Sequence, residues 1–123
     1  TIYIVNDAFQ HWFCGNFEKY SNNEDALPFD QHELISMIAP RPVYVSSGSE
    51  DNWADQKGEY LSLVGATPVY NLYGHEGFTS TEKPGVEDPK TVGRMGNHMR
   101  KGDHDILLYD WTQFINFADK FLK

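Results

Sequence analysis

The chain has 123 residues, of which 40% are hydrophobic and 15% aromatic, which is enough apolar surface for one globular unit and not for two. Ten basic residues against eighteen acidic ones give a net charge of −8, so the basic surface that nucleic-acid binding requires is absent. No apolar run approaches the roughly 20 residues of a membrane-spanning helix, and residues 1–5 lack the features of a signal peptide. We therefore expect neither a nucleic-acid partner nor a membrane partner.

The first third of the chain shows little periodicity. Residues 1–5 are β-branched and aromatic, which predicts a short strand. Residues 6–28 are aromatic and polar without a clear period, which predicts an ordered loop or short helices. Asp30 and Glu33 then have the spacing of a capping box before an apolar stripe, so we expect a helix over residues 31–38 that two prolines end.

The middle of the chain reads as a strand, a loop and a helix. Residues 43–45 are β-branched and aromatic and lead into turn-prone residues, as in a buried parallel strand whose C-terminal end delivers a loop. That loop covers residues 49–55. Helical spacing resumes over residues 56–64, and Gly65 is expected to end the helix.

The last part of the chain predicts a second strand, a long loop and a terminal helix. Residues 68–73 have the composition of a strand, whereas residues 74–103 hold several glycines and prolines with almost no apolar run. So long a loop usually has a functional reason. Asp110 and Gln113 should cap a terminal helix. Its apolar stripe has helical spacing and consists of Trp111, Phe114, Ile115, Ala118, Phe121 and Leu122.

This order of elements places two polar loops at one edge of a sheet. A strand, helix, strand, helix pattern predicts a parallel sheet covered by helices, and ligands bind beyond the carboxyl ends of such strands. One loop carries Glu50 and Asp51, and the other carries His104. In a serine esterase a histidine shuttles the proton of the nucleophile while a carboxylate orients the ring, and in α/β-hydrolases both follow the last two strands. Asp51 and His104 satisfy that order, whereas Glu50 is better explained as a solvated neighbour.

By spacing alone the pair is weak evidence, because a histidine in a polar loop is more often solvated than catalytic. Longer motifs add to it. The chain resembles, in the order and spacing of its motifs, the last third of bacterial glucuronoyl esterases. The stretches that carry the resemblance are residues 12–14, 16–17, 27–35, 38–45, 50–55 and 98–105.

The resemblance implies an α/β fold, with residues 1–123 forming the C-terminal segment of a single α/β-hydrolase esterase domain whose nucleophile-bearing half is absent. It implies a secreted or periplasmic serine-type carbohydrate esterase that cleaves the ester between 4-O-methyl-glucuronic acid on xylan and lignin alcohols, without a metal or organic cofactor. Carried over by position, His104 is the general base, Asp51 is the acid, and Trp53 lines the sugar pocket. Packing within its loop is the competing interpretation of Trp53.

The chain also departs from the family pattern. The nucleophile elbow has no counterpart, since the nearest candidate, residues 47–49, lies on the acid loop. The oxyanion-binding arginine that accompanies the elbow is missing as well. Some members place the acid on an earlier strand, which would leave Asp51 as an auxiliary carboxylate. We therefore expect this chain alone to be inactive, and its partners to be the N-terminal portion of the hydrolase domain and a glucuronoxylan or lignin–carbohydrate ester.

Three alternatives stay open. One is an acetyl xylan esterase-like hydrolase, and another is a non-catalytic carbohydrate-binding or assembly module that uses Trp12, Trp53 and Tyr73 as stacking platforms. The third is a metal site, since histidine and carboxylate suit zinc or manganese, although the spacing has no recognised metal geometry. Its candidate ligands are His75, Glu76, His98, His104 and Asp105.

Overall fold

The computed structural model describes residues 2–122 and divides into two compact units, residues 1–30 and 31–123. The first unit begins with α1 (Ile2–Ala8), followed by short 3₁₀ helices at Gln10–Trp12, Phe17–Tyr20 and Glu24–Ala26. The strand predicted over residues 1–5 is therefore wrong for residues 2–5, and Thr1 lies outside the described residues. Strand propensity reflects packing against neighbouring strands, and no strand of residues 2–122 pairs with this segment. The short helices expected within residues 6–28 are confirmed.

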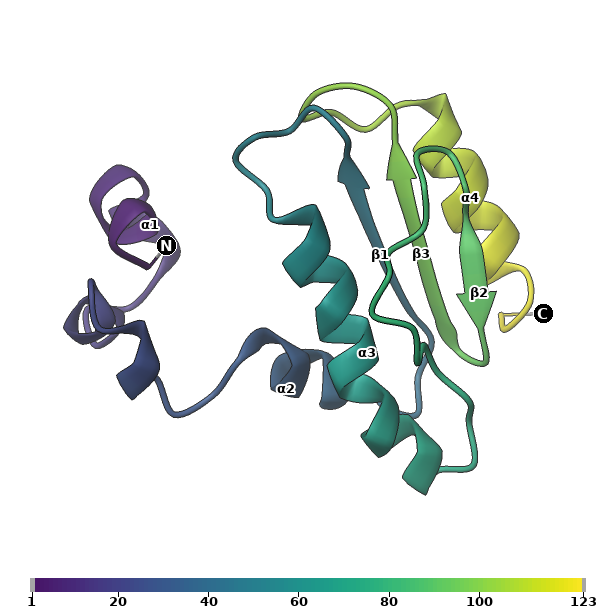
Figure 1. The fold of residues 1–123 in the computed structure, drawn as a ribbon, viewed down its shortest axis with the longest axis horizontal. Helices are drawn as coiled ribbons and strands as arrows, with labels where there is room; N and C mark the ends of the chain where they lie inside the picture. Colours follow the sequence, from purple (N-terminus) through teal and green to yellow (C-terminus); the bar gives the residue numbers. More distant parts are fainter. Residues whose placement is uncertain (1, 123) are drawn as a thin grey trace. The chain divides into compact units, whose positions relative to one another are not determined.

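The second unit is built on a three-stranded sheet (Figure 1). Its strands are β1 (Val43–Gly48), β2 (Lys90–Val92) and β3 (Met95–Arg100), in the order β1-β3-β2. β1 and β3 are parallel, and their register runs from Val43 opposite Met95 to Gly48 opposite Arg100. β2 pairs antiparallel with β3. The parallel pair confirms the α/β fold class, and it brings the C-terminal ends of β1 and β3 to one edge.

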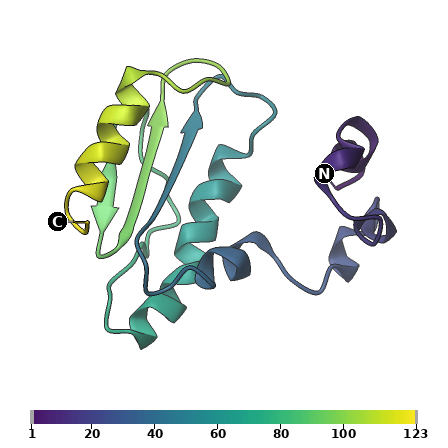
Figure 2. The same cartoon turned by 180° about the vertical axis from the view of Figure 1, so that it is seen from behind.

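Helices cover both faces of this sheet (Figures 1 and 2). α2 (Gln31–Ser36) packs on α3 (Gln56–Leu72), which covers one face, and α4 (Leu108–Ala118) covers the other. Because side chains alternate along a strand, β1 and β3 serve both faces. The core beneath α3 consists of Ile35, Val43, Tyr60, Leu63, Ala66, Tyr70, Phe78 and Met95. No helix within residues 2–122 is long and apolar enough to cross a membrane.

α3 is much longer than its sequence predicts. The predicted end at Gly65 and the predicted strand over residues 68–73 are both wrong, because the helix continues to Leu72. Gly65 serves packing instead, since a Cβ there would lie 2.8 Å from the Cβ of His32 in α2. Pro68 lies on the exposed side of the helix, and the apolar periodicity continues past it to Tyr70, which is fully buried.

The second parallel strand lies within the predicted loop. Residues 74–103 contain β2 and β3, so the interpretation of the whole segment as a loop is wrong. β3 lacks an apolar run because several of its buried positions are polar and satisfied by hydrogen bonds, for example the Asn97 amide to the Val45 carbonyl at 3.1 Å. Gly96 is required by packing, since a Cβ there would lie 2.2 Å from the ring of Tyr44.

The terminal helix is confirmed, but its start and buried face differ. α4 begins at Leu108, so Asp110 lies in its first turn, where its carboxylate accepts the Leu107 N–H at 2.7 Å. Of the predicted apolar stripe, Trp111 and Ile115 are more than half exposed, and Leu122 lies beyond the end of the helix. Phe117, which the stripe left out, is buried against the ring of Tyr44 instead.

The core beneath α3 supports a stability prediction. Leu63 is fully buried, so Leu63→Ala should lower the free energy of unfolding by about 2–5 kcal/mol through lost burial and a residual cavity. Leu72→Ala, on the same helix at 84% exposure, is the matched control, and its effect should stay within about 0.5 kcal/mol. Thermal unfolding of both variants, in the chain or in a longer polypeptide that carries it, checks this. Equal losses would contradict the assigned core.

Candidate active site

The loop after β1 carries the predicted acid and is fixed at both ends. The Gln56 side chain at the start of α3 donates to the Gly48 carbonyl at 2.9 Å and to the Asp51 carbonyl at 2.8 Å. Asp55 caps α3 by accepting the Gly58 N–H at 2.9 Å, which is the usual role of an aspartate before a first helical turn. The loop therefore leaves the strand and enters the helix with little freedom around Asp51.

The loop after β3 lies directly beside it. The β1–β3 pairing continues past the strand ends, because the Ser49 N–H donates to the Arg100 carbonyl at 2.8 Å and the Glu50 N–H to the Gly102 carbonyl at 2.9 Å. Gly48 makes this approach possible, since a Cβ there would lie 2.6 Å from the Asp103 carbonyl oxygen. The acid loop and the histidine loop thus meet at the sheet edge that the sequence predicted.

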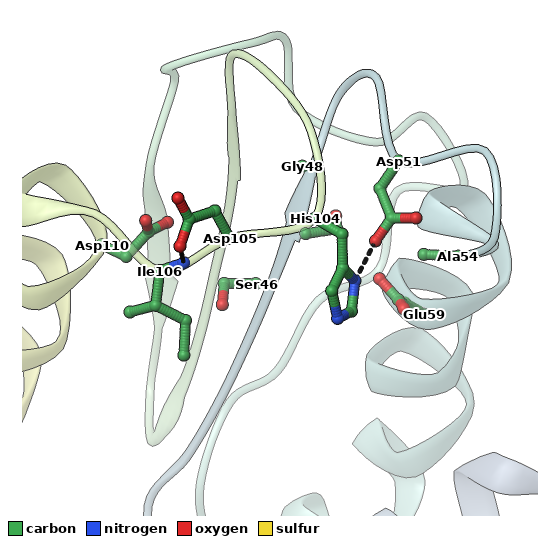
Figure 3. A pocket seen from close by; sticks show the side chains of 10 residues that line it. Ser46, Gly48, Asp51, Ala54, Glu59, His104, Asp105, Ile106 and Asp110 are labelled. Carbon is green, nitrogen blue, oxygen red and sulfur yellow. Dashed lines mark hydrogen bonds and ion pairs between the residues drawn. The ribbon is translucent and has the colours of Figure 1, made fainter.

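His104 and Asp51 form a hydrogen-bonded pair at this meeting point. His104 Nδ1 lies 2.6 Å from Asp51 Oδ2, and Figure 3 shows the other ring nitrogen pointing away from the carboxylate. A carboxylate only accepts hydrogen bonds, so Nδ1 carries the proton and Nε2 of the neutral ring offers a lone pair. The His104 side chain is 91% exposed and that of Asp51 only 6%. In this arrangement the exposed Nε2 of His104 can accept a proton from a group that enters the pocket.

The surroundings of Asp51 keep it ionised. The hydrogen bond with His104 holds the pKa of Asp51 below its ordinary value against the opposing effect of burial, helped by the N–H groups of Trp53 and Ala54. The Trp53 N–H donates to Asp51 Oδ1 at 3.0 Å. Both carboxylate oxygens are therefore engaged, one by the backbone and one by the imidazole.

An open pocket of about 560 Å³ surrounds this pair (Figure 3). It is lined by Ser46, Ser47, Gly48, Asp51, Ala54, Glu59, His104, Asp105, Ile106 and Asp110. Burial raises the pKa of Glu59, the charges of Asp51 and Asp55 act in the same direction, and a hydrogen bond with Ser47 opposes them. Sequence reasoning missed Glu59 because a glutamate in the first turn of a helix is an ordinary surface residue.

The other residues that the sequence singled out occupy different surroundings. Trp53 is 77% exposed on the acid loop, outside the residues that line the pocket, so packing within its loop does not bury it. Glu50 is exposed, and it contacts the histidine loop through its backbone N–H, which donates to the Gly102 carbonyl. The structure therefore brings Asp51 and His104 together, and leaves Trp53 beside them as an exposed aromatic surface.

A second histidine–carboxylate pair lies inside the unit. His98, fully buried in β3, places Nε2 at 2.7 Å from Asp110 Oδ1 and Nδ1 at 3.0 Å from the Tyr44 hydroxyl. Burial, with Tyr109 and Asp110 nearby, raises the pKa of Tyr44 to about 12. The hydroxyl therefore stays protonated and donates a hydrogen bond to His98 Nδ1. With no solvent access, His98 cannot exchange protons with a substrate. Its predicted place in a loop is also wrong.

These two pairs separate the candidate metal ligands. His98 is paired with Asp110 inside the sheet, whereas His104 is paired with Asp51 at the surface. Among residues 2–122, no group of three or more histidine, cysteine, aspartate or glutamate side chains is placed to hold a metal ion. The alternative of a metal site built from the loop histidines is therefore wrong for the described part of the chain.

Comparisons with known sequences point to one family. A family model described as glucuronyl esterase of fungi matches residues 4–74, more than half of the chain. The carbohydrate esterase MZ0003 of an unknown prokaryotic organism is 45% identical over 120 residues, covering 97% of this chain and 27% of the relative. The 4-O-methyl-glucuronoyl methylesterase 1 of Wolfiporia cocos is 34% identical over 87 residues, covering 71% of this chain and 19% of its own length.

Solved structures agree. A glucuronoyl esterase from Solibacter usitatus superposes with a TM-score of 0.87 at 41% identity, over 95% of this chain and 30% of that one. A promiscuous esterase of carbohydrate esterase family 15 from a marine bacterial metagenome superposes with a TM-score of 0.90 at 43% identity, over 97% of this chain and 30% of that one. The chain thus spans less than a third of these relatives and matches their C-terminal part.

Proposed function

The chain belongs to the glucuronoyl esterase family, and from this membership we propose that it supplies the acid and the histidine of a serine-type carbohydrate esterase. The proposed reaction is hydrolysis of esters of 4-O-methyl-glucuronic acid in lignin–carbohydrate complexes. The observation that carries the proposal is the 2.6 Å hydrogen bond between His104 and Asp51, two residues that line an open pocket. In this assignment His104 Nε2 takes the proton of the nucleophile and returns it to the leaving alcohol, while Asp51 stabilises the imidazolium.

The nucleophile is proposed to lie in the remaining portion of the hydrolase domain. Ser46 and Ser47 line the pocket, but both belong to β1, and neither follows a strand in the sharp strand-to-helix turn of a nucleophile elbow. The term complete enzyme means this chain together with the portion that supplies the serine. Export from the cell is part of the proposal, because the substrate is a plant cell-wall polymer.

The substrate assignment favours a glucuronate ester over an acetyl ester. Trp53 lies two residues after the acid and is largely exposed, as expected of an aromatic platform on which a sugar ring can stack. An acetyl ester on xylan needs no such platform for its acyl group. The test compares hydrolysis of benzyl glucuronate with that of an acetylated xylose by the complete enzyme. A clear preference for the acetyl ester would favour the acetyl xylan esterase alternative.

The proposal also predicts how the chain behaves alone. Within residues 2–122 the outer edge of β1 has no strand paired to it, and Leu108, Trp111 and Ile115 leave an apolar stripe of α4 exposed. Unpaired strand edges and large apolar patches seek a partner or aggregate. We expect the 123-residue chain to form aggregates when expressed alone, and to be monodisperse when it is co-expressed with the nucleophile-bearing portion.

Light scattering and thermal unfolding of the two preparations check this expectation. The chain alone should also show no turnover of benzyl glucuronate, and activity should return with the partner portion. A soluble monomer with a sharp, cooperative unfolding transition would contradict the prediction. Sugar binding by that monomer would instead support the carbohydrate-binding alternative.

A further inference from the structure

Arg100 occupies an unusual place relative to the histidine loop. It is the last residue of β3, its side chain is only 4% exposed, and the loop of residues 101–105 that carries His104 begins directly after it. A buried guanidinium must have its charge paired and its N–H groups bonded, because an unsatisfied buried charge is costly. The partners that satisfy it therefore show what the residue holds in place.

Three of its four partners are backbone carbonyls of the histidine loop. Nη1 donates to the Lys101 carbonyl at 2.8 Å, and Nη2 donates to the carbonyls of Asp103 at 2.7 Å and Asp105 at 2.9 Å. Asp103 and Asp105 are the residues on either side of His104. One planar group thus holds the carbonyl groups of both neighbours of the histidine.

The fourth partner anchors the guanidinium to the protein interior. Nε donates to Asp110 Oδ2 at 2.8 Å, and the other oxygen of Asp110 lies 2.7 Å from Nε2 of buried His98. Burial raises the pKa of Asp110, but the hydrogen bonds from Leu107 and His98 and the charge of Arg100 outweigh it, so the pKa lies below its ordinary value. The anchor therefore stays ionised and hydrogen-bonded.

We propose that Arg100 is a positioning residue of the reaction, whose guanidinium holds the loop of residues 101–105 so that His104 meets Asp51. The inference rests on the proposed function. Lysine could keep the charge opposite Asp110, but its single nitrogen cannot span three carbonyls as the planar fork of arginine does. A role in geometry and a role in charge therefore predict different responses to substitution.

The test uses Arg100→Lys and Asp110→Asn in the complete enzyme with benzyl glucuronate as the substrate. Arg100→Lys keeps the charge but loses the loop contacts, so kcat should fall by about 10- to 100-fold, as expected for a misplaced catalytic group, with KM changed less than about threefold. Asp110→Asn removes the charge, but its amide oxygen can still accept from Arg100 and Leu107. Its NH2 group can donate to His98 Nε2 if the His98 proton moves to Nδ1, next to the Tyr44 hydroxyl, so its loss of kcat should be smaller. The reverse order would show that Arg100 acts only as a counter-charge and would overturn the proposal.

A spectroscopic measurement tests the same point without turnover. The proton between His104 Nδ1 and Asp51 should give a low-field NMR signal, which should broaden or vanish in Arg100→Lys. The matched control is Arg94→Lys, because Arg94 also contacts a backbone carbonyl, that of Pro40 at 3.3 Å, just before the opposite end of β3. Both the NMR signal and kcat should be unchanged in Arg94→Lys.

The outcomes separate this inference from the proposed function. An unsubstituted complete enzyme that does not hydrolyse benzyl glucuronate contradicts the function, while the NMR signal still tests the positioning role. An active enzyme whose Arg100→Lys variant keeps both kcat and the signal overturns the positioning role alone. Titration of the catalytic serine with a covalent reagent counts the folded active sites in each variant preparation. If Arg100→Lys does not fold, a loss greater than tenfold in folded Asp110→Asn contradicts the proposal.

Discussion

Replacing His104 by alanine should lower kcat of the complete enzyme on benzyl glucuronate by at least about 10²-fold, the typical contribution of a general base. The ring is the proton acceptor in the proposed reaction. It is exposed, and among residues 2–122 its side chain makes a single polar contact, that to Asp51. Its removal therefore leaves little of the fold disturbed. KM should change little, because the alanine variant keeps the other residues that line the pocket and the exposed ring of Trp53 beside them. Steady-state kinetics checks both values.

The matched control for this variant is His75→Ala. His75 follows α3 and lies outside the residues that line the pocket, so kcat should be unchanged. His98→Ala is a poor control, because His98 is fully buried and its loss would remove the hydrogen-bond partner of the Tyr44 hydroxyl and of Asp110 Oδ1. An active His104→Ala enzyme would show that the proton shuttle has been assigned to the wrong residue.

The pH dependence gives a second check on His104. The ring must be neutral to accept the serine proton, so activity should fall as the solution is acidified, because an imidazolium cannot act as a base. Asp51 does not set this limb, since its pKa lies below its ordinary value of about 4 and it remains ionised above that pH. Activity that is constant down to pH 5 would argue against a histidine base.

The sequence was sufficient to predict the pair because its chemistry is local. Asp51 follows a strand of β-branched and aromatic residues, and His104 precedes a strongly amphipathic helix. The prediction that their loops share one sheet edge used a second strand at residues 68–73, which is wrong, but the strand that does precede His104, β3, is also parallel to β1, so the edge is the same. The motifs around both residues also carried the resemblance to the family. The position of the site thus depended on features that a linear reading detects.

The strand that delivers His104 could not be found in the same way. Strand prediction relies on apolar runs, and β3 instead buries Asn97, His98 and Arg100. Such residues are stable inside only because partners distant in sequence satisfy them, as Asp110 does for the last two. The same reason hid the positioning role of Arg100. Tertiary hydrogen bonds of this kind leave no periodic signal.

α3 shows the opposite failure, in which a local signal was misleading. Gly65 and Pro68 usually end helices, yet α3 passes through both. The glycine is there because α2 packs too closely for a side chain, and the proline occupies an exposed turn. Burial of Ala66 and Tyr70 against the core keeps the second half of the helix in place. Packing thus outweighed local propensity, as it commonly does.

Asp51→Asn should lower kcat by about 10⁴-fold if Asp51 is the only acid of the triad. The asparagine amide can donate to Nδ1, which would place the ring proton on Nε2, where it blocks transfer from the serine. If an upstream carboxylate shares the role, the loss should be smaller but still exceed about tenfold, because one of two counter-charges remains. Glu50→Gln, a neighbouring and exposed carboxylate, is the matched control and should keep full activity.

The pH profile of the Asp51→Asn variant distinguishes the two cases. A carboxylate beside the ring favours the charged imidazolium, so its removal should move the acid limb of kcat to lower pH, and a second carboxylate would limit that movement.

The stability of the folded chain should also depend on pH through Asp51. Because the pKa of Asp51 is lowered in the folded chain, its stabilising contribution is present above the ordinary aspartate value of about 4 and is lost on further acidification. The parent should therefore lose stability relative to Asp51→Asn as the pH falls below about 4. An unmoved limb together with full activity would remove Asp51 from the triad.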